Sequence, residues 1–316
     1  MEKCNEKYNL KDYKKALECY EKQLEKNPQN KEALYKKANT LNKLGLFEEA
    51  IIYYDKYLEI DLTNKKVFNN KANALNNLRR FNEALECYDE CLKIDSTYIN
   101  ALTNKGTVLT IIGEYKQAIK HYDKCLELNP DDINILYNKA NALNNLKKFE
   151  EAIIYYDKCL NINPNHIHAL GNKGSALRVS GRYDEAIETY NQFLKIDSTN
   201  KRALFNKAFT FSNQGKFKQA IETYDEYLKL DPLNKTALNN KAYGLEKLEK
   251  YNKAIETYKL VLQEDEDNIA ALLGTGNSLF KLKKYKKSLE YYNKVLTLDS
   301  ENILALNSKE EVLKYL

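Results

Sequence analysis

Residues that break helices are scarce in this sequence of 316 residues, which has 4 prolines, 10 glycines and no tryptophan. Proline and glycine are the least favourable residues in a helix interior, whereas the abundant Lys, Glu, Leu and Ala favour helix. No stretch is apolar enough to span a membrane, and the first residues, MEKCNEKYNLKDY, lack the apolar run of a signal peptide. We therefore expect a helical protein without a membrane span and predict a cytoplasmic location.

Side chains that commonly perform catalysis are also few. The three histidines, His121, His166 and His168, form no catalytic pattern with Ser, Cys or Asp, and no phosphate-binding glycine loop is present. Cys87 and Cys91 are spaced i, i+4, but no second Cys or His pair completes a metal site. We therefore predict no enzymatic activity, no cofactor and no metal.

A concentrated stripe of basic residues is absent as well. The chain has 50 basic and 45 acidic residues, well mixed, with a net charge of +5. Phosphate binding needs clustered positive charge, and its salt dependence would be steep. Nucleic-acid binding is therefore the least favoured of the functions considered below.

What the chain does contain is a repeat of 34 residues without insertion or deletion. Eight full units span 31–64, 65–98, 99–132, 133–166, 167–200, 201–234, 235–268 and 269–302. A partial unit, 1–30, precedes them, and a single helix, 303–316, follows and is predicted to cap the array. An alanine, or serine in the last unit, recurs at unit position 20, and a tyrosine follows it at position 24 in all nine passes: Tyr20, Tyr54, Tyr88, Tyr122, Tyr156, Tyr190, Tyr224, Tyr258 and Tyr292.

Each unit is predicted to form two helices. Apolar or small residues at positions 3, 4, 8 and 11 mark one buried face of a first helix, and positions 20, 24 and 28 mark a second. Position 15, between them, is often glycine, which suits a left-handed helix end: Gly45, Gly113, Gly181 and Gly215. Asn or Asp often precedes the next unit as a predicted N-cap: Asn30, Asn64, Asp132, Asn200, Asn234 and Asn268.

The length of 34 and the pattern of Ala, then an aromatic residue, then Pro in the second half of the unit resemble the tetratricopeptide repeat family. The first half departs from that family, with Leu or Phe for Trp, Lys for the first Leu, and Leu for Tyr. The resemblance implies one all-α, right-handed superhelical solenoid of stacked antiparallel helix pairs over residues 1–316. It also implies a non-catalytic scaffold for protein–protein interaction whose first helices line a concave groove. The 35-residue RNA-reading helical repeat would need an extra residue in each unit.

Asparagine is concentrated on the predicted groove. Positions 5, 6, 9, 12 and 13 of the eight units give 40 sites, 18 of them Asn, whereas 36 outward sites of the second helices include only Asn161. A codon bias toward Asn could explain its abundance but not this placement. A carboxamide offers a donor and an acceptor, and the resemblance implies binding to the backbone of an extended peptide. The alternative is that these side chains are solvated or bond one another. The predicted binding residues at positions 6 and 9 are Asn70, Asn104, Asn138, Asn172, Asn206, Asn240, Asn39, Asn73 and Asn141.

Apolar side chains are expected on the same groove in the second half of the chain. The predicted cluster consists of Phe205, Phe209, Tyr243, Leu273 and Phe280, with Arg178 and Arg202 nearby. Exposed apolar residues on one side suggest a pocket for an anchor residue of a partner. The alternatives are packing between neighbouring first helices and self-association. The chaperone-tail clamp of some relatives is not expected, because no position 5 is Lys and no position 6 is Arg.

Two further features are predicted to be structural. Lysines at position 7 are expected to pair with aspartates at position 25 at a similar height in the same hairpin, with Lys241, opposite Lys259, as an exception. The cysteines are expected to be free, buried thiols in a reducing compartment, because equivalent positions of neighbouring units lie about 8–10 Å apart, beyond disulfide reach. The six are Cys4, Cys19, Cys87, Cys91, Cys125 and Cys159.

These observations predict a scaffold that binds a protein or an extended peptide in the asparagine-rich groove. One alternative is a structural module that self-associates through its ends or through the aromatic cluster. RNA binding is a third possibility, disfavoured by the mixed surface charge.

Overall fold

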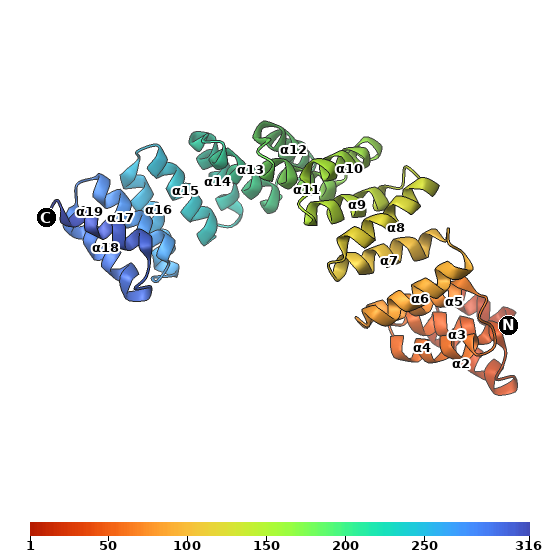
Figure 1. Cartoon of the computed structure of the whole chain (residues 1–316). Coiled ribbons are helices and arrows are strands. Elements are labelled where there is room, and N and C mark those ends of the chain that lie inside the picture. Colours follow the sequence, from red (N-terminus) through yellow and green to blue (C-terminus); the bar gives the residue numbers. More distant parts are fainter. The chain divides into compact units, whose positions relative to one another are not determined.

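The structure, a computed structural model, describes residues 1–316 and contains 19 α-helices and no strand (Figure 1). The helices are α1 Glu2–Asn9, α2 Tyr13–Lys26, α3 Lys31–Lys43, α4 Phe47–Leu58, α5 Lys65–Asn77, α6 Phe81–Ile94, α7 Ile99–Ile111, α8 Tyr115–Leu128, α9 Ile133–Asn145, α10 Phe149–Ile162, α11 Ile167–Val179, α12 Tyr183–Ile196, α13 Lys201–Asn213, α14 Phe217–Leu230, α15 Lys235–Lys247, α16 Tyr251–Glu264, α17 Ile269–Lys281, α18 Tyr285–Leu298 and α19 Ile303–Leu313. The predicted all-α fold of stacked helix pairs is confirmed.

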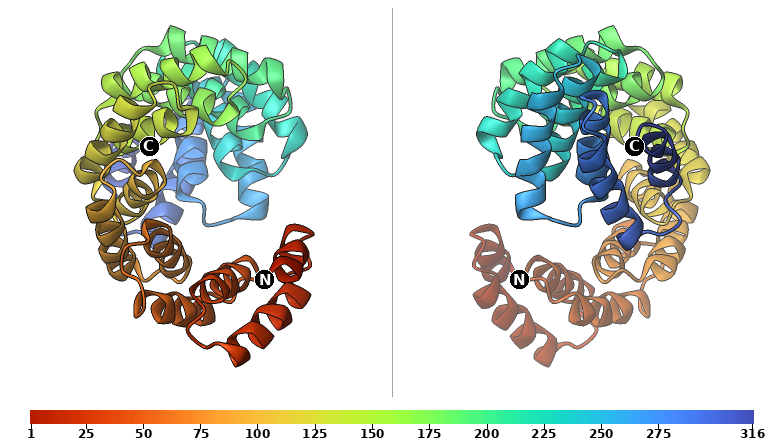
Figure 2. Two further views of the ribbon diagram at one scale, coloured as in Figure 1. Left: turned by 90° about the vertical axis from the view of Figure 1, so that its right-hand side faces the viewer. Right: turned by 90° about the vertical axis from the view of Figure 1, so that its left-hand side faces the viewer.

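The chain forms two compact units, Met1–Ile162 and Asn163–Leu316. The first unit contains α1 to α10 and the second contains α11 to α19. In each unit every helix packs on the next helix along the chain, so that hairpins lie side by side (Figure 2). The organisation of residues 1–316 as a single solenoid stays a prediction.

The tyrosines at position 24 form the centre of each hairpin. Tyr20, Tyr54, Tyr88, Tyr122, Tyr156, Tyr190, Tyr224 and Tyr292 are among the largest fully buried side chains of the protein. Burying a ring of this size contributes about 1.5–3 kcal/mol. A small residue at position 8 of the first helix makes room for it: a Cβ at Gly106 would lie 2.7 Å from the ring of Tyr122. The repeated pairing of a small residue with tyrosine therefore sets the spacing of the two helices.

The turn between the two helices of a hairpin uses one left-handed residue at position 15. Four hairpins have glycine there, with φ from 79° to 88°: Gly45, Gly113, Gly181 and Gly215. Five others keep the same turn with a side chain, at φ from 57° to 60°: Lys11, Arg79, Lys147, Glu249 and Lys283. The tertiary packing of the hairpin therefore imposes this conformation even where the residue does not favour it.

The predicted N-caps are present. Asn30, for example, accepts a hydrogen bond from the backbone N–H of Ala33 at 3.1 Å, and Asn64, Asp132, Asn200, Asn234 and Asn268 cap their helices in the same way. Three further caps, Asp12, His166 and Asn302, were not predicted from the sequence. His166 accepts through Nδ1 from the N–H of Ala169 at 3.1 Å, at the start of α11.

The last helix, α19, leaves uncovered the face that a second helix covers in every full unit. Leu306 at position 4 is 41% exposed and Leu313 at position 11 is 52% exposed, whereas leucines at these positions elsewhere are buried. Glu310, at the position that holds Ala or Gly in the full units, is exposed. The uncovered face is thus a mixture of apolar and charged residues.

The prediction that all six cysteines are free thiols is wrong for two of them. Cys4 and Cys19 form a disulfide, with a Cα–Cα distance of 5.4 Å, and the other four are free and buried. The prediction compared equivalent positions of neighbouring units only. Cys4 and Cys19 instead occupy positions 8 and 23 of one hairpin, α1–α2, where the two facing helices are close enough for a disulfide.

Candidate functional site

The first helices of neighbouring hairpins touch one another within each unit. Contacts join α3 to α5, α5 to α7 and α7 to α9 in the first unit, and α11 to α13, α13 to α15, α15 to α17 and α17 to α19 in the second. Residues at positions 5, 6, 9, 12 and 13 of these helices share one side, because they are three or four residues apart. We call this surface the amide face. In each unit the amide face extends across a row of adjacent first helices.

Asparagine at position 9 of the amide face is bonded to the buried tyrosine of its own hairpin. The Tyr54 hydroxyl donates to Asn39 Oδ1 at 2.7 Å, and the Tyr88 hydroxyl donates to Asn73 Oδ1 at 2.6 Å. The same bond joins Tyr20 to Asn5, Tyr156 to Asn141 and Tyr292 to Asn277 at 2.7–2.8 Å. A buried hydroxyl without a partner is costly, so these asparagines stabilise the core. This role was not anticipated from the sequence, although the 15-residue spacing of Asn and Tyr was a visible signal.

Asparagine at position 6 continues this network between hairpins. Asn70 Nδ2 donates to Asn39 Oδ1 at 3.0 Å, and Asn104 Nδ2 donates to Asn73 Oδ1 at 2.9 Å. The side-chain oxygens of Asn39 and Asn73 therefore each accept from a tyrosine and from the next asparagine. Because both donors bond the oxygen, the carboxamides of Asn39 and Asn73 are held in a fixed orientation. The two N–H groups of each carboxamide are not used in these bonds.

Three position-6 asparagines lack this neighbour. Asn138, Asn206 and Asn240 follow units whose position 9 is Thr107, Ser175 or Phe209. The three side chains are half-buried, and no side-chain hydrogen bond joins Asn138 or Asn206 to the chain. Their donor and acceptor groups are therefore available to a ligand. Asn172, by contrast, accepts from Arg202 Nη2 at 3.3 Å.

The loss of asparagine at position 9 has different consequences for the tyrosines. The hydroxyls of Tyr122 and Tyr190 contact Thr110 Oγ1 and Ser175 Oγ, each at 3.2 Å. The Tyr224 hydroxyl, in the hairpin that has Phe209 at position 9, is buried with no hydrogen-bond partner, and burial raises its pKa to about 12. The Tyr258 hydroxyl instead donates to Glu246 at 3.1 Å.

The predicted aromatic cluster separates into two groups. Phe205 and Phe209 stack with ring centroids 6.4 Å apart, and the guanidinium of Arg178 lies 5.1 Å from the Phe209 ring. Phe205 also meets Tyr224 and Tyr227 edge-on at 5.9 and 5.7 Å, so it belongs largely to the core of its hairpin.

The second group lies nearer the C-terminus. Tyr243, 46% exposed, contacts Phe217 at 6.2 Å, whereas Phe280 contacts Tyr285 and Tyr315. Tyr243 and Phe280 both line a cavity of about 400 Å³. Leu273 instead packs against the core formed with Leu272 and Val295. The sequence therefore grouped five residues that the structure places in three settings.

The predicted lysine–acid ladder exists, but it joins neighbouring hairpins rather than residues within one hairpin. Lys71 pairs with Asp55 of the preceding unit at 2.5 Å, and Lys105 and Lys139 pair with Asp89 and Asp123. The predicted exception was wrong, because Lys241 pairs with Asp225 at 2.6 Å. Helix packing places position 7 against the second helix of the preceding hairpin.

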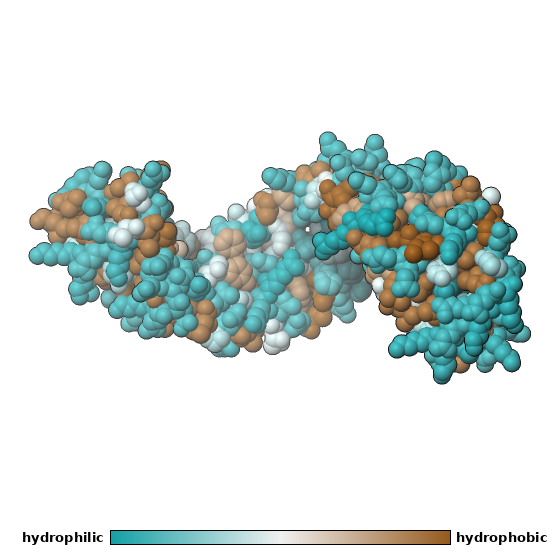
Figure 3. Space-filling view, turned by 90° about the horizontal axis from the view of Figure 1, so that it is seen from below, coloured by the Kyte–Doolittle hydropathy of each residue, from teal (hydrophilic) through white to brown (hydrophobic).

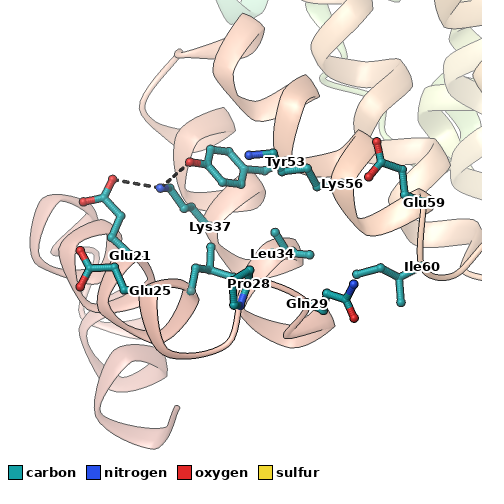
Figure 4. Close-up of a pocket in the computed structure, with 11 residues that line it drawn as sticks. Glu21, Glu25, Pro28, Gln29, Leu34, Lys37, Tyr53, Lys56, Glu59 and Ile60 are labelled. Atoms are coloured by element: carbon teal, nitrogen blue, oxygen red, sulfur yellow. Dashed lines mark hydrogen bonds and ion pairs between the residues drawn. The ribbon is translucent and has the colours of Figure 1, made fainter.

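At the N-terminal end of this ladder Lys37 lies in a cavity of about 700 Å³ near α2 and α4 (Figure 4). Its ammonium bonds Glu21 at 3.0 Å and the Tyr53 hydroxyl at 2.8 Å, and lies 4.1 Å from the centre of the Tyr53 ring. The Lys37 side chain is 7% exposed. These contacts satisfy the charge of the Lys37 ammonium. Because the lysine is buried and paired in this way, we interpret the ladder as a structural feature.

No helix has the length and hydropathy needed to cross a membrane. No group of three or more His, Cys, Asp or Glu side chains is placed to hold a metal ion. On the face seen in Figure 3, hydrophilic side chains cover most of the surface, with apolar ones between them.

These features define a helical repeat protein with a polar row along its first helices. Tetratricopeptide repeat models match residues 3–64, 66–98, 99–132, 131–199, 177–240, 236–268 and 269–302. The chain therefore belongs to the tetratricopeptide repeat (TPR) family. Members of this family generally mediate protein–protein interactions and are generally not catalytic.

Solved structures share the fold. The C-terminal part of a TPR repeat-containing protein from Cytophaga hutchinsonii is 17% identical, with a TM-score of 0.67 over 76% of this chain and 98% of that one. YrrB, described as a TPR protein with an unusual peptide-binding site, is 24% identical, with a TM-score of 0.54 over 60% and 97%. MamA from Desulfovibrio magneticus RS-1 is 22% identical, with a TM-score of 0.52 over 54% and 97%. No curated protein matches the sequence.

Proposed function

We propose that the protein is a non-catalytic scaffold that binds an extended segment of a partner protein along the amide face. The main support is a set of polar groups that the fold holds in place and does not use. Asn39 and Asn73 keep both amide N–H groups available, while Asn138 and Asn206 keep a donor and an acceptor. A peptide backbone presents one N–H and one C=O at most residues. The two sets of groups are therefore complementary.

Fixed orientation favours such binding. The Asn73 carboxamide is held by Tyr88 and Asn104, so it loses little side-chain freedom when a ligand binds. Amides also bind main-chain groups without reading side chains, which suits an extended segment. The solved structure of YrrB, described as having a peptide-binding site, adds a precedent among proteins of this fold.

The experiment separates binding from stability. Peptides are selected from a random displayed library, and their affinity is measured by fluorescence anisotropy for the wild type, Asn138→Ala and Asn206→Ala. Each variant is expected to weaken binding about fivefold, the contribution of one hydrogen bond, without a change in melting temperature. Asn82→Ala, which changes an exposed asparagine of α6, is the matched control. Selected peptides that bind all four proteins equally would exclude the amide face.

Self-association is a second candidate function, favoured by the apolar side chains exposed on α19. Ile303 and Leu304 of α19 are 71% and 67% exposed, next to Leu306 and Leu313. Removing such side chains from water would favour a contact with a second copy. Light scattering at increasing protein concentration tests this. A rise in mass that Leu306→Lys abolishes would support the contact, and a constant monomer mass would exclude it.

A further inference from the structure

A cavity on the amide face of the second unit differs from the rest of that face. It has a volume of about 400 Å³ and lies between α15, α17 and α19, with Tyr243, Glu246, Tyr251, Asn277, Phe280 and Glu311 on its walls. We call it the Glu246 cavity. At position 12, where five other units have Asn, Thr or Ser, α15 has Glu246, and aromatic rings line the same cavity.

The carboxylate of Glu246 is held by two neutral donors. Glu246 Oε1 accepts from Ser278 Oγ at 2.7 Å, and Oε2 accepts from the Tyr258 hydroxyl at 3.1 Å. Both donor residues are buried. A carboxylate has about four acceptor positions, so two remain on Glu246. Its partial burial raises the pKa of Glu246, against the opposing effects of Ser278, Tyr258 and Lys247.

Three linked departures from the repeat create this arrangement. Tyr243 replaces the asparagine at position 9, so Tyr258 has no amide acceptor in its own hairpin. Gly274 replaces the asparagine at position 6 of the next unit, and a Cβ there would lie 2.2 Å from the Tyr258 ring. The ring therefore uses the space of that side chain, and its hydroxyl reaches Glu246 instead. The third departure is Glu246 at position 12, whose carboxylate replaces an asparagine as the acceptor for Tyr258.

Three carboxylates, Glu246, Glu249 and Glu311, line the cavity together with Lys247 and Lys281. The two lysine ammonium groups lie 5.1 Å from the Tyr243 ring centre and 6.0 Å from the Phe280 ring centre. The cavity therefore has one more carboxylate than ammonium groups, and each ring already lies near one cation.

We propose that the Glu246 cavity binds an arginine side chain of the partner segment, an inference that rests on the proposed binding of a peptide to the amide face. The planar guanidinium matches two acceptor positions of one carboxylate and stacks on aromatic rings, which an ammonium does less well. The remaining acceptor positions of Glu246 and the rings of Tyr243 and Phe280 provide these contacts. The cavity would thus give sequence preference to a face that otherwise reads only the peptide backbone.

The first test uses a probe that does not depend on a partner. N-acetyl-arginine methylamide is titrated into the full chain and followed by NMR, with the uncharged citrulline analogue as the matched ligand. Saturable changes in the chemical shifts of the backbone amides near Gly274 and Ser278 are expected with the arginine probe only. Glu246→Gln should weaken binding about tenfold, as expected for a charged hydrogen-bonded pair, and Glu226→Gln, which changes an exposed residue of α14, should not. The proposal would be overturned if the arginine and citrulline probes bound equally, or if Glu246→Gln bound the arginine probe as tightly as the wild type does. A lack of saturable binding of the arginine probe would also overturn it. A thermal melt shows whether Glu246→Gln is folded.

The second test distinguishes this inference from the proposed function. If selected peptides lose affinity with Asn138→Ala but neither contain arginine nor respond to Glu246→Gln, the amide face binds peptides and the arginine site is wrong. If the arginine probe binds and no peptide depends on Asn138 or Asn206, the arginine site stands and peptide binding along the amide face fails.

Discussion

At the scale of single residues, the position-24 tyrosine explains much of the asparagine content. The ring must be buried to fill the hairpin, but its hydroxyl then needs an acceptor. Asparagine at position 9 supplies that acceptor in five hairpins, as Asn73 does for Tyr88. The Asn73 oxygen thus serves the core, while its N–H groups stay available on the amide face.

This pairing predicts opposite outcomes for one substitution at two equivalent sites. Tyr88→Phe removes a hydroxyl that donates to Asn73, so the free energy of unfolding should fall by about 1 kcal/mol. Tyr224→Phe removes a buried hydroxyl without a partner, so stability should stay the same or rise. Guanidinium denaturation of both variants measures this. A comparable loss in the two would show that the hydroxyls contribute equally, contrary to the structure.

His121 predicts a pH dependence of stability. Burial, with the charges of Lys105 and Lys124, lowers the pKa of His121 to about 4, and its Nδ1 has no hydrogen-bond partner. Between its ordinary value of about 6.5 and 4, the unfolded chain binds a proton that the folded chain does not. Stability should therefore fall as the pH falls through this window.

The test variant is His121→Thr, because threonine occupies the same unit position at Thr189, Thr223 and Thr257. Thermal melts from pH 7 to pH 4 should show a smaller loss for His121→Thr than for the wild type. The pKa of Asp95, lowered to about 2 by its bonds to Lys65 and Thr97, places the titration of that carboxyl below the window. Parallel pH profiles for the two proteins would contradict the assignment to His121.

At the scale of helices and turns, five hairpins use a left-handed residue that is not glycine. Lys147, with φ of 60°, is exposed and holds the turn between α9 and α10. Such a conformation costs a side chain about 1–2 kcal/mol, and glycine avoids that cost but loses more entropy on folding. We expect Lys147→Gly to stabilise the protein by about 0.5–1 kcal/mol.

The reverse substitution provides the comparison. Gly113 has φ of 88°, and a Cβ added there would meet no atom within 4 Å. Gly113→Ala should therefore destabilise the protein by about 1 kcal/mol through the backbone alone. Chemical denaturation checks both changes. Stabilisation by Gly113→Ala, or destabilisation by Lys147→Gly, would contradict this reading of the turns.

At the scale of the whole molecule, stability arises from contacts between neighbours. Within each unit every helix packs on the next, and neighbouring first helices such as α3 and α5 touch one another. In such an array a local change affects the adjacent repeat most and distant repeats little. The ladder of position-7 lysines follows the same logic, because each pairs with the hairpin before it, as Lys71 does with Asp55.

The disulfide gives a direct test of this locality. Cys4 and Cys19 are 15 residues apart, and closing a loop of that length contributes about 3 kcal/mol. Cys19→Ser should raise hydrogen exchange in α1, α2 and the adjoining α3 and leave α11 to α19 unchanged, as measured by mass spectrometry. Thiol labelling under denaturing conditions should find four reactive cysteines before reduction and six after it. Uniformly faster exchange along the chain would show coupling beyond nearest neighbours.

The sequence alone determined the helix pairs, the turns, the caps and the family, because these depend on residues that recur every 34 positions. Tyr88 and Ala84 mark a buried face and Gly113 marks a turn wherever the register places them. The asparagine-rich side was visible for the same reason, since residues three and four apart share one side of a helix.

Only the tertiary structure decided which partner each of these side chains meets. The Cys4–Cys19 bridge, the pairing of Lys241 with Asp225, and the reach of Tyr258 to Glu246 all depend on how two helices are placed against each other. A sequence period specifies what each helix presents, but not the offset at which neighbouring helices pack. Hydrogen bonds and disulfides form only over a few ångströms, so that offset determines which asparagines stabilise the core and which stay available to a ligand.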